Sequence, residues 1–191
     1  MRAIILAAGR GSRMQRLTDK QPKCLIKLGG RRLIDWQTTA LKDAGIHDIG
    51  IVGGYRQDAF NNLPYRLFEN PEWKATNMVS SLLCASDWLE QEACIISYSD
   101  IFYPAEAVQN ICSSEADIAL SYDINWKDLW QKRMNNPLED AETFKMQSDG
   151  TLIEIGKRPK SMNDIQGQYM GLFKVTPSGF SAILRYLQVL S

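Results

Sequence analysis

The sequence has few of the residues and patterns that point to several large classes of protein. It has a single histidine, His47, and its four cysteines are widely separated and form no C-x-x-C pair. Neither a zinc site nor a redox dithiol is therefore indicated. No apolar run reaches the ~20 residues that a membrane helix needs, and the N-terminus lacks the basic and apolar regions of a signal peptide. These absences predict a cytoplasmic protein with reduced cysteines.

An excess of charge of one sign is also missing. Lysine and arginine total 22, aspartate and glutamate also total 22, and the formal net charge is zero. A protein that coats nucleic acid or an anionic membrane normally carries a strongly basic surface, so neither partner is expected. A chain of 191 residues is long enough for a substantial core. Because no linker or repeat interrupts it, we expect a single domain over residues 1–191.

The most informative stretch lies at the start of the chain. A short apolar run, residues 3–8, opens into a loop that contains Gly9 and Gly11. Glycine lets backbone N–H groups approach an anion closely and reaches positive φ angles. Arg13 then offers a planar fork of donors to phosphate oxygens, and Lys23 is a compact charge suited to an α-phosphate. The stretch therefore predicts a loop that holds a triphosphate.

The spacing of this loop differs from the two best-known phosphate loops. No Lys-Ser or Lys-Thr closes it as in G-x-x-x-x-G-K-[ST], and Met14 stands where G-x-G-x-x-G needs a third glycine. The stretch instead resembles the signature of the nucleotidyltransferase family that makes NDP-sugars and CDP-alcohols. The residues that carry the resemblance are Leu6, Ala7, Ala8, Gly9, Gly11, Ser12, Arg13, Pro22 and Lys23. The resemblance implies that the loop binds the nucleotide and that Arg13 and Lys23 are catalytic.

Strands and helices alternate over the first two thirds of the sequence. Helical spacing covers residues 33–44, with Trp36 or Gln37 on the buried face and Gly45 as the stop. After the opening run, strands are expected over residues 49–52, 65–69, 94–98 and 117–122, and helices over 56–62, 78–90 and 104–112. This order predicts a mostly parallel sheet with ligands at the carboxyl ends of its strands. The expected class is α/β, and the resemblance implies a Rossmann-like three-layer nucleotidyltransferase fold.

The pattern loosens in the last third of the sequence. Residues 126–133 predict a short helix, and residues 144–147 and 152–155 predict a hairpin with Asp149-Gly150 at its turn. A core strand over residues 168–175 and a helix over residues 178–190 complete the expected elements.

Asp100 follows the strand expected over residues 94–98, so its carboxylate should lie at a strand end. A carboxylate near phosphates typically shares a Mg²⁺ ion that keeps several waters. The family resemblance implies this role, which makes Asp100 a catalytic residue and a metal ligand. The alternative is a helix-capping or loop carboxylate. The family usually has a second acid after a later strand that this sequence does not show, so truncation of the chain at its C-terminus is left open.

The resemblance also implies where the base of the nucleotide binds. In the family, backbone groups near residues 7–9 meet the pyrimidine edge, and side chains at the start of a later helix complete the contact. Asn77, Ser80 and Ser81 fit that description. The choice of cytidine over another base depends on the resemblance alone.

Motifs after the opening loop narrow the resemblance. These motifs are Thr76–Leu82, Ser97–Ile101, Trp126–Arg133, Asn136–Thr143 and Gln168–Phe173. They resemble bacterial cytidylyltransferases whose acceptors are phosphoglutamine, phosphocholine or 2-aminoethylphosphonate, with phosphoglutamine favoured. The resemblance implies an enzyme that transfers CMP from CTP to a small phosphorylated nitrogen compound, for capsule or cell-surface modification, and that uses Mg²⁺.

The same region offers candidates for recognition of the acceptor. Trp126 and Trp130 lie four residues apart, so a helix presents them on one face, and an indole face attracts an ammonium by ~0.5–2 kcal/mol. The guanidinium of Arg133 suits a phosphate or carboxylate, and the acids Glu139 and Asp140 suit an amine or amide. Lys157 resembles a family lysine that meets the acceptor phosphate. The alternatives are tryptophans in a core, acids on a solvated loop and a lysine in a surface turn.

Two other functions stay open at this point. A sugar-1-phosphate nucleotidylyltransferase would use UTP, dTTP or GTP on the same scaffold. A catalytically inactive nucleotide-binding module is the second alternative, because the second acid is missing, although Arg13, Lys23 and Asp100 argue against it. The sequence does not decide the oligomeric state, for which a homodimer is one alternative.

Overall fold

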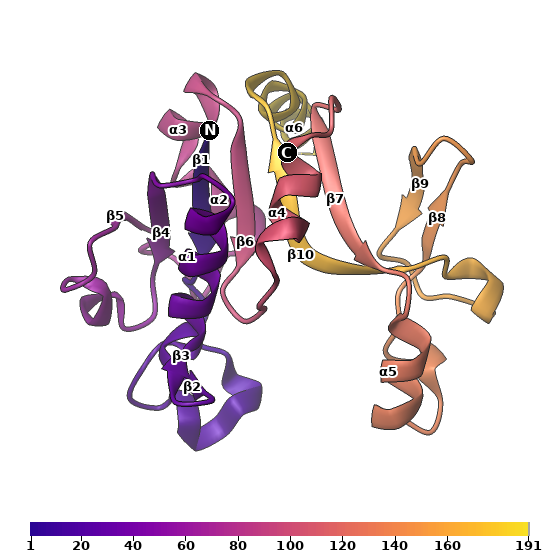
Figure 1. Cartoon of the computed structure of the whole chain (residues 1–191), viewed down its shortest axis with the longest axis horizontal. Helices are drawn as coiled ribbons and strands as arrows, with labels where there is room; N and C mark the ends of the chain where they lie inside the picture. The colour runs from indigo at the N-terminus through magenta and orange to yellow at the C-terminus, as the bar shows by residue number, and fades with distance from the viewer. Residues whose placement is uncertain (191) are drawn as a thin grey trace. The chain divides into compact units, whose positions relative to one another are not determined.

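The computed structural model describes residues 1–190, and the chain divides into two compact units. Unit 1 comprises Met1–Ala119 together with the segment that starts at Gly171, and unit 2 comprises Leu120–Met170. The chain leaves unit 1 within strand β7 (Ile118–Asp123) and returns within strand β10 (Gln168–Val175) (Figure 1). The single domain expected over the whole chain stays a prediction.

A six-stranded sheet forms the centre of unit 1, in the order β5-β4-β1-β6-β10-β7. Its other strands are β1 (Arg2–Leu6), β4 (Ile49–Gly53), β5 (Arg66–Glu69) and β6 (Cys94–Tyr98). Strand β1 pairs in parallel with β4 and β6, β4 pairs in parallel with β5, and β10 runs antiparallel to β6. The mostly parallel sheet predicted from the alternating pattern is therefore confirmed.

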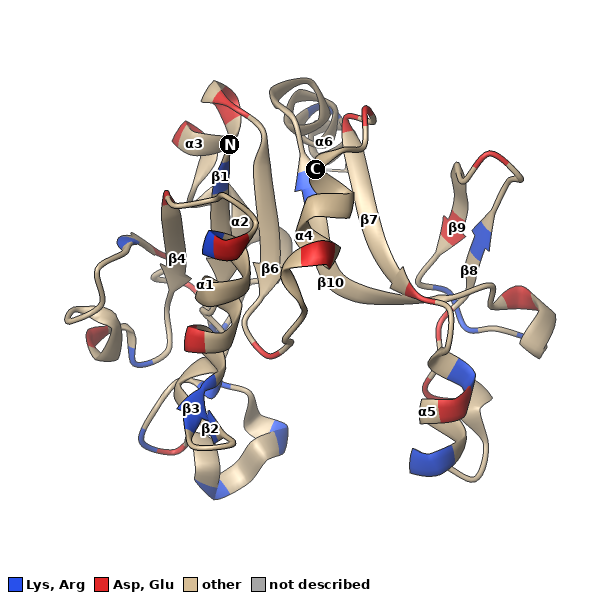
Figure 2. Ribbon diagram, in the orientation of Figure 1, with Lys and Arg blue, Asp and Glu red and all other residues tan. Residues whose placement is uncertain are grey.

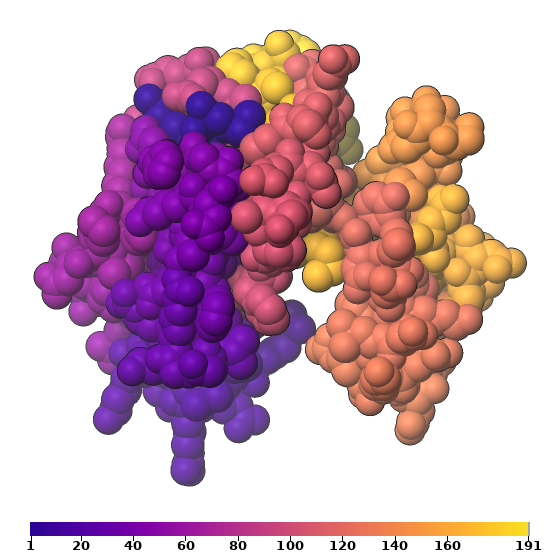
Figure 3. Space-filling model, in the orientation of Figure 1, coloured from indigo at the N-terminus to yellow at the C-terminus, as the bar shows by residue number. Residues whose placement is uncertain are grey.

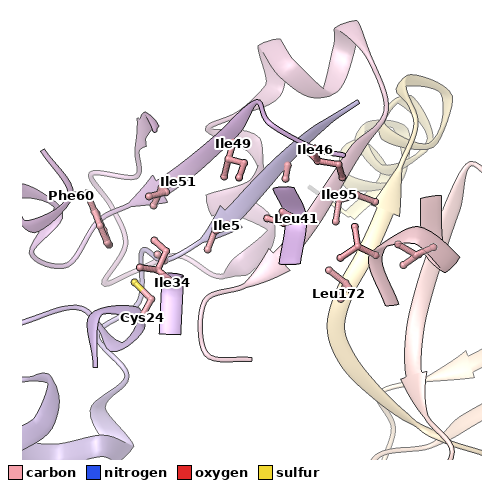
Figure 4. Close-up of a cluster of buried hydrophobic side chains, with 14 residues drawn as sticks. Ile5, Cys24, Ile34, Leu41, Ile46, Ile49, Ile51, Phe60, Ile95 and Leu172 are labelled. Atoms are coloured by element: carbon pink, nitrogen blue, oxygen red, sulfur yellow. The ribbon is translucent and has the colours of Figure 1, made fainter. Parts of the chain in front are cut away.

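Hydrophobic side chains on both faces of this sheet explain why helices cover both. One face packs against α1 (Leu33–Asp43) and α4 (Ala105–Cys112), whose atoms lie over the strands in the space-filling view (Figure 3). This cluster includes Ile5, Ile51 and Ile95 from the strands and Ile34 and Leu41 from α1 (Figure 4). It also includes Val108 from α4. The opposite face packs against α2 (Met78–Leu83), α3 (Ser86–Gln91) and α6 (Pro177–Leu190). Burial on both faces produces the three layers.

The helix expected over residues 78–90 is in fact two helices. The backbone leaves helical geometry at Ala85, where φ is −108° and ψ is 24°. The N–H groups of Cys84 and Ala85 bond to carbonyls three residues back, and the Ser86 hydroxyl donates to the Leu83 carbonyl. The tightened turn ends α2 and lets Trp88 pack edge-on against Phe68, with ring centroids 5.2 Å apart. Tertiary packing therefore overrides the continuous helical pattern.

Two other local expectations are refined by the structure. The short helix expected over residues 56–62 is a 3₁₀ turn, Gln57–Phe60, which follows Arg56 at a φ of 50°. In α1 the buried position is taken by Gln37, which is fully buried, whereas Trp36 is 39% exposed. The remaining short elements of unit 1 are the 3₁₀ turns Ser12–Thr18 and Lys23–Leu25 and the small hairpin of β2 (Lys27–Leu28) and β3 (Arg31–Arg32).

Unit 2 is small and has its own core. It contains α5 (Trp126–Arg133), a 3₁₀ turn (Pro137–Glu139), the antiparallel hairpin of β8 (Phe144–Met146) and β9 (Leu152–Ile155), and a second 3₁₀ turn (Met162–Asp164). The predicted hairpin is confirmed, and Gly150 has a φ of 85° in its turn. Among the described residues, no helix in either unit is long and apolar enough to cross a membrane.

Candidate active site

A cavity of about 400 Å³ lies at the carboxyl ends of the neighbouring parallel strands β1 and β6. Its size falls within the range of ~300–1,000 Å³ that is common for small-ligand pockets. Seven of the residues that line it were predicted as site residues: Leu6, Gly9, Gly11, Ser12, Arg13, Lys23 and Asp100. The first strand, the loop after it and the turn after β6 therefore meet around one space, as expected for ligand sites in parallel sheets.

The glycines of the opening loop have different surroundings. A Cβ atom at Gly9 would meet nothing within 4 Å, so the backbone there faces open space. Gly11 has a φ of 67°, and a Cβ atom there would lie 3.2 Å from Cδ of Lys23. Gly11 thus lets the loop pack on the aliphatic part of Lys23, while Gly9 leaves room for a ligand against the backbone.

Hydrogen bonds of Thr18 and Tyr55 anchor the far end of the loop. The hydroxyl of Thr18, which is fully buried, donates to the carbonyls of Gly11 and Gln15 at 3.3 Å and 3.1 Å. The hydroxyl of Tyr55 lies 2.9 Å from the Thr18 carbonyl and 2.8 Å from that of Asp19. These bonds hold the loop against the body of unit 1 while Arg13 reaches the cavity.

Lys23 and Asp100 form an ion pair at this cavity. Nζ of Lys23 lies 2.7 Å from Oδ2 of Asp100, and the two side chains are 28% and 37% exposed. Lys23 begins the 3₁₀ turn after Pro22, and Asp100 stands in the turn after β6, so the sheet brings together two groups that are 77 residues apart in the sequence. An ion pair with this much exposure contributes at most about 1 kcal/mol to stability. Its location at a cavity therefore has more bearing on binding than on folding.

The segment around the cavity is strongly basic. Residues 10–32 contain eight lysines and arginines and a single acid, Asp19. The basic residues gather around β2, β3 and the loop before them (Figure 2). They are Arg10, Arg13, Arg16, Lys20, Lys23, Lys27, Arg31 and Arg32. A concentration of positive charge in a protein of zero net charge favours the approach of a small polyanion to this side of unit 1.

Two backbone groups near the expected base contacts are already hydrogen-bonded within the protein. The N–H of Ala7 donates to the Val52 carbonyl, and the carbonyl of Ala8 accepts from the N–H of Tyr55, both at 2.8 Å. These two backbone groups extend the pairing of β1 with β4 and are already hydrogen-bonded. Ala7 and Ala8 are also 2% and 4% exposed. The first alanines of the loop thus support its geometry, and the open space begins at Gly9.

The helix-start candidates also differ from the expectation. Oδ1 of Asn77 accepts from the N–H groups of Val79 and Ser80 at 3.0 Å and 3.1 Å, so its side chain caps α2. Ser81 is 5% exposed and accepts from Nδ2 of Asn70 at 3.0 Å. Asn77, Ser80 and Ser81 are absent from the described lining of the cavity, and the residue from α2 that lines it is Met78.

Three lining residues were missed by reasoning from the sequence: Met78, Tyr98 and Ser99. Tyr98 depends on a glycine of β10, which is distant in sequence but neighbours β6 in the sheet, because Gly171 has a φ of 79° and a Cβ atom there would lie 2.8 Å from Cδ2 of Tyr98. The glycine within the strand Gln168–Val175 was the available signal, since glycine inside a strand often marks close approach of another group.

The donors at the cavity fit a cation that is shared with a polyphosphate. Mg²⁺ is usually bound by one or two carboxylates together with substrate phosphates and waters. Asp100 supplies one carboxylate at the cavity. Within residues 1–190, no group of three or more His, Cys, Asp or Glu side chains could hold a metal ion by itself. The site therefore suits a metal that depends on the ligand for most of its coordination.

The tryptophans proposed for acceptor binding have structural surroundings. Trp126 is 4% exposed and packs with Ala141 and Ile165 in the core of unit 2. The ring of Trp130 lies edge-on to it, with centroids 6.1 Å apart, and Cζ of Arg133 lies 5.5 Å from the Trp130 ring. The indole face of Trp126 is thus unavailable to a ligand, which corrects that expectation in favour of the core alternative.

The polar candidates of unit 2 do not form a pocket by themselves. Glu139 and Asp140 are exposed, and Glu139 accepts a hydrogen bond from Asn136 at 3.4 Å. Lys157 is 71% exposed and pairs with Glu154 at 2.6 Å. The Lys157 side chain, as the largest contribution, holds the pKa of the Glu154 carboxyl below its usual value. The structure gathers the three predicted catalytic residues in unit 1, whereas the roles proposed for Arg133, Glu139, Asp140 and Lys157 stay predictions.

Comparisons with known proteins agree with the geometry of unit 1. Residues 3–142 match the family model described as the MobA-like NTP transferase domain. The chain is 41% identical over 200 residues to CTP:phosphoglutamine cytidylyltransferase of Campylobacter jejuni subsp. jejuni serotype O:2, which covers 100% of this chain and 79% of that protein. It is 40% identical over 111 residues to 2-aminoethylphosphonate cytidylyltransferase of Lancefieldella rimae, which covers 56% of this chain and 45% of that protein.

A solved structure extends the agreement to the fold. The inositol-1-phosphate CTP transferase from T. maritima is similar with a TM-score of 0.73 at 25% sequence identity, over 94% of this chain and 72% of that chain. The fold class and the family predicted from the opening loop are both confirmed. The matched residues 3–142 include the opening loop, Lys23 and Asp100. This chain belongs to the MobA-like NTP transferase family.

Proposed function

We propose that this protein is a CTP-dependent cytidylyltransferase that transfers CMP to a small phosphorylated, nitrogen-containing acceptor and releases pyrophosphate. The observation that carries the proposal is the meeting of Arg13, Lys23 and Asp100 at one cavity, beside a glycine loop with open space against its backbone. The similarity to cytidylyltransferases supports CTP as the donor, and the similarity over the full chain makes phosphoglutamine the favoured acceptor.

The reaction needs positioning and charge stabilisation more than covalent chemistry by the protein. An oxygen of the acceptor phosphate attacks the α-phosphorus of CTP, and a new P–O bond forms. The bond between the α-phosphorus and the bridging oxygen breaks, and pyrophosphate leaves with the electron pair. No covalent enzyme intermediate is required, so the rate depends on alignment in line with the leaving group and on neutralisation of charge.

Each group at the cavity has a place in this scheme. The ammonium of Lys23 turns from Asp100 to the α-phosphate, where charge develops during attack, and the guanidinium of Arg13 holds the β- and γ-phosphates. Asp100 would hold Mg²⁺, and the ion would supply further neutralisation of phosphate charge. Gly9 leaves the backbone accessible to the triphosphate.

We assign the described lining of the cavity to the nucleotide. This assignment keeps Leu6, Gly9, Gly11 and Ser12 from the predicted set and adds Met78, Tyr98 and Ser99. Acceptor recognition by Arg133, Glu139, Asp140 and Lys157 remains part of the proposal. Capsule or cell-surface modification suits a CDP-conjugate of this kind, and we place the reaction in the cytoplasm with no nucleic acid or membrane partner.

The proposal is tested by a matrix of donors and acceptors, read by release of pyrophosphate. CTP, UTP, GTP and dTTP are combined with phosphoglutamine, phosphocholine, 2-aminoethylphosphonate and glucose-1-phosphate in the presence of Mg²⁺. We expect turnover with CTP and a phosphorylated nitrogen compound. Turnover with a sugar phosphate and another nucleotide would indicate a sugar-1-phosphate nucleotidylyltransferase, and binding of CTP without any product would indicate an inactive nucleotide-binding module. Either result would overturn the proposal.

A further inference from the structure

A buried glutamine of α1 reaches the turn that carries Asp100. Gln37 is fully buried, and its Nε2 lies 2.7 Å from the carbonyl oxygen of Tyr98 and 2.5 Å from that of Ile101. One side-chain amide therefore connects the two ends of the four-residue segment 98–101, which we call the Asp100 turn. Ser99 and Asp100 lie between the two carbonyls that it holds.

Other contacts also hold the start of the Asp100 turn, since Tyr98 pairs with Leu6 in the sheet. The hydroxyl of Ser97 also donates to the Tyr98 carbonyl, at 3.0 Å. The helix that supplies Gln37 is firmly packed, since Ile34 and Leu41 of α1 are fully buried in the core of unit 1. Gln37 thus attaches the start and the end of the Asp100 turn to the well-packed helix α1.

The orientation of the amide follows from its partners. An amide nitrogen carries two protons, and Gln37 uses both on carbonyl oxygens. The reversed orientation would place Oε1 against the same two oxygens, where it could accept nothing. Among residues 1–190, Oε1 of Gln37 has no hydrogen-bond partner although it is buried.

An unpartnered buried acceptor is unfavourable for folding. A buried polar atom without a partner loses its hydration and gains nothing in return, and an apolar side chain of the same shape can be as stable or more stable at such a place. Gln37 does more here than fill the core, because it donates to two carbonyls. Its two donated bonds to the Asp100 turn supply a reason for an amide at this position.

We propose that Gln37 is a positioning residue that holds the Asp100 turn in the geometry with which Asp100 receives the divalent cation. This inference rests on the proposed function, because it takes Asp100 as the carboxylate that meets the cation and the triphosphate. Gln37 itself is buried and contacts neither. Groups that orient a metal-binding side chain typically change metal affinity or activity by about 10- to 100-fold when they are removed.

The first test measures the Asp100 turn directly and needs no activity. Gln37→Met keeps the length of the side chain and removes both donors, and Thr38→Val is the matched control. Thr38 is 4% exposed on the same helix, and its hydroxyl donates within α1, to the Asp35 carbonyl at 3.5 Å. In the ligand-free protein, we expect hydrogen exchange of a peptide containing residues 98–101 to become about tenfold faster in Gln37→Met and to stay within about twofold in Thr38→Val.

The second test measures the consequence for the cation. The half-saturating Mg²⁺ concentration for pyrophosphate release should rise about tenfold in Gln37→Met, while the rate at saturating Mg²⁺ changes by less than about threefold. Thr38→Val should keep the wild-type Mg²⁺ dependence. If Gln37→Met does not fold, Gln37→Asn replaces it, because the shorter amide keeps the polarity and cannot reach both carbonyls.

The outcomes separate this inference from the proposed function. Unchanged exchange of the Asp100 turn in a folded Gln37 variant would overturn the inference. A rate loss without a change in Mg²⁺ dependence would also overturn it, since it would indicate general damage to the core. If the wild-type protein releases no pyrophosphate, the proposed function fails, and the exchange comparison still decides whether Gln37 holds the turn.

Discussion

The ammonium of Lys23 lies 2.7 Å from the carboxylate of Asp100, although the two residues are 77 positions apart in the sequence. In the proposed function Lys23 meets the α-phosphate and Asp100 meets the cation, and in this structure the two side chains contact each other. A triphosphate with its cation offers both groups stronger partners, since phosphates attract the ammonium and the cation attracts the carboxylate. Under the proposed function, the triphosphate and its cation replace the contact between these two groups.

Removing either member of the pair should lower the rate of turnover and leave the stability of the fold nearly unchanged. We expect Lys23→Met and Asp100→Asn each to lower the rate of pyrophosphate release by about 10²- to 10³-fold, because each removes charge stabilisation at the reacting phosphates. The free energy of unfolding should change by less than about 1 kcal/mol, since the pair is partly exposed. Steady-state kinetics and urea denaturation measure the two effects.

Asp87→Asn is the control for these variants. Asp87 forms a comparable ion pair with Arg66, at 2.6 Å, with both side chains about half exposed. Its removal should leave turnover at the wild-type rate. Equal rate losses in Asp87→Asn and Asp100→Asn would mean that loss of surface charge, and not the location of Asp100, explains the effect.

Gly171→Ala should disturb the cavity through Tyr98. At Gly171 the backbone has a φ of 79°, and an added Cβ would lie 2.8 Å from the Tyr98 ring. The left-handed conformation alone costs an alanine about 1–2 kcal/mol. The contact with Tyr98 should add to this cost and should also weaken CTP binding, as measured by calorimetry.

Gly45→Ala isolates the cost of the backbone conformation. Gly45 has a φ of 89°, and a Cβ atom there would meet nothing within 4 Å. We expect it to lose about 1–2 kcal/mol of stability and to keep its affinity for CTP. Equal stability losses in the two variants, with unchanged CTP binding, would show that the Tyr98 contact is unimportant.

Acid should loosen unit 2 through Asp164. Its carboxylate accepts from Nζ of Lys145 at 2.9 Å and from the N–H groups of Lys160 and Ser161. The Lys145 side chain and these backbone bonds lower the pKa of Asp164 from 3.8 to about 2. Because the pKa is lower in the folded state, the unfolded chain binds more protons over this range. The stabilisation is complete well above pH 3.8 and is lost as the pH falls toward 2.

Hydrogen exchange of unit 2 peptides between pH 5 and pH 2, corrected for intrinsic rates, measures this effect. Protection of the wild type should fall with pH, and Asp164→Asn should show weaker protection at pH 5 and a flatter pH dependence. Identical pH profiles in the two proteins would exclude Asp164 as the source of acid sensitivity.

Trp126→Ala should act on stability and not on recognition of the acceptor. Trp126 is 4% exposed in the core of unit 2, and removal of a buried tryptophan costs about 3–5 kcal/mol. Leu129→Ala on the same helix is the control, because Leu129 is 44% exposed. Denaturation should show a large loss only for Trp126→Ala. A folded Trp126→Ala protein of normal stability with a raised KM for the acceptor would restore the role in binding.

Much of unit 1 could be predicted because its signals are local. Apolar runs of strand length alternate with helical spacing, and Gly9 and Gly11 mark the first loop. The pattern also placed Asp100 at the end of its strand, whereas the shared site of Lys23 and Asp100 was implied by the family resemblance.

Other features depend on packing that the sequence does not display. The helical spacing allows either Trp36 or Gln37 on the buried face of α1. Gln37 takes the buried position, where its amide donates to two carbonyls of the Asp100 turn. The break at Ala85 depends on the place of Trp88 beside Phe68. The spacing of Trp126 and Trp130 is compatible with a core or with a ligand site. In the structure Trp126 packs in a core with Ala141 and Ile165, which the spacing of the tryptophans does not show.

Calorimetric titration of CTP with Mg²⁺ into the wild type, Lys23→Met and the control Asp87→Asn tests directly whether the cavity holds the triphosphate. We expect the wild type and Asp87→Asn to bind CTP with the same affinity and Lys23→Met to bind at least about tenfold more weakly, because a charge-assisted bond to phosphate is lost. Equal affinity for CTP in Lys23→Met and the wild type would contradict the claim that this cavity holds the triphosphate.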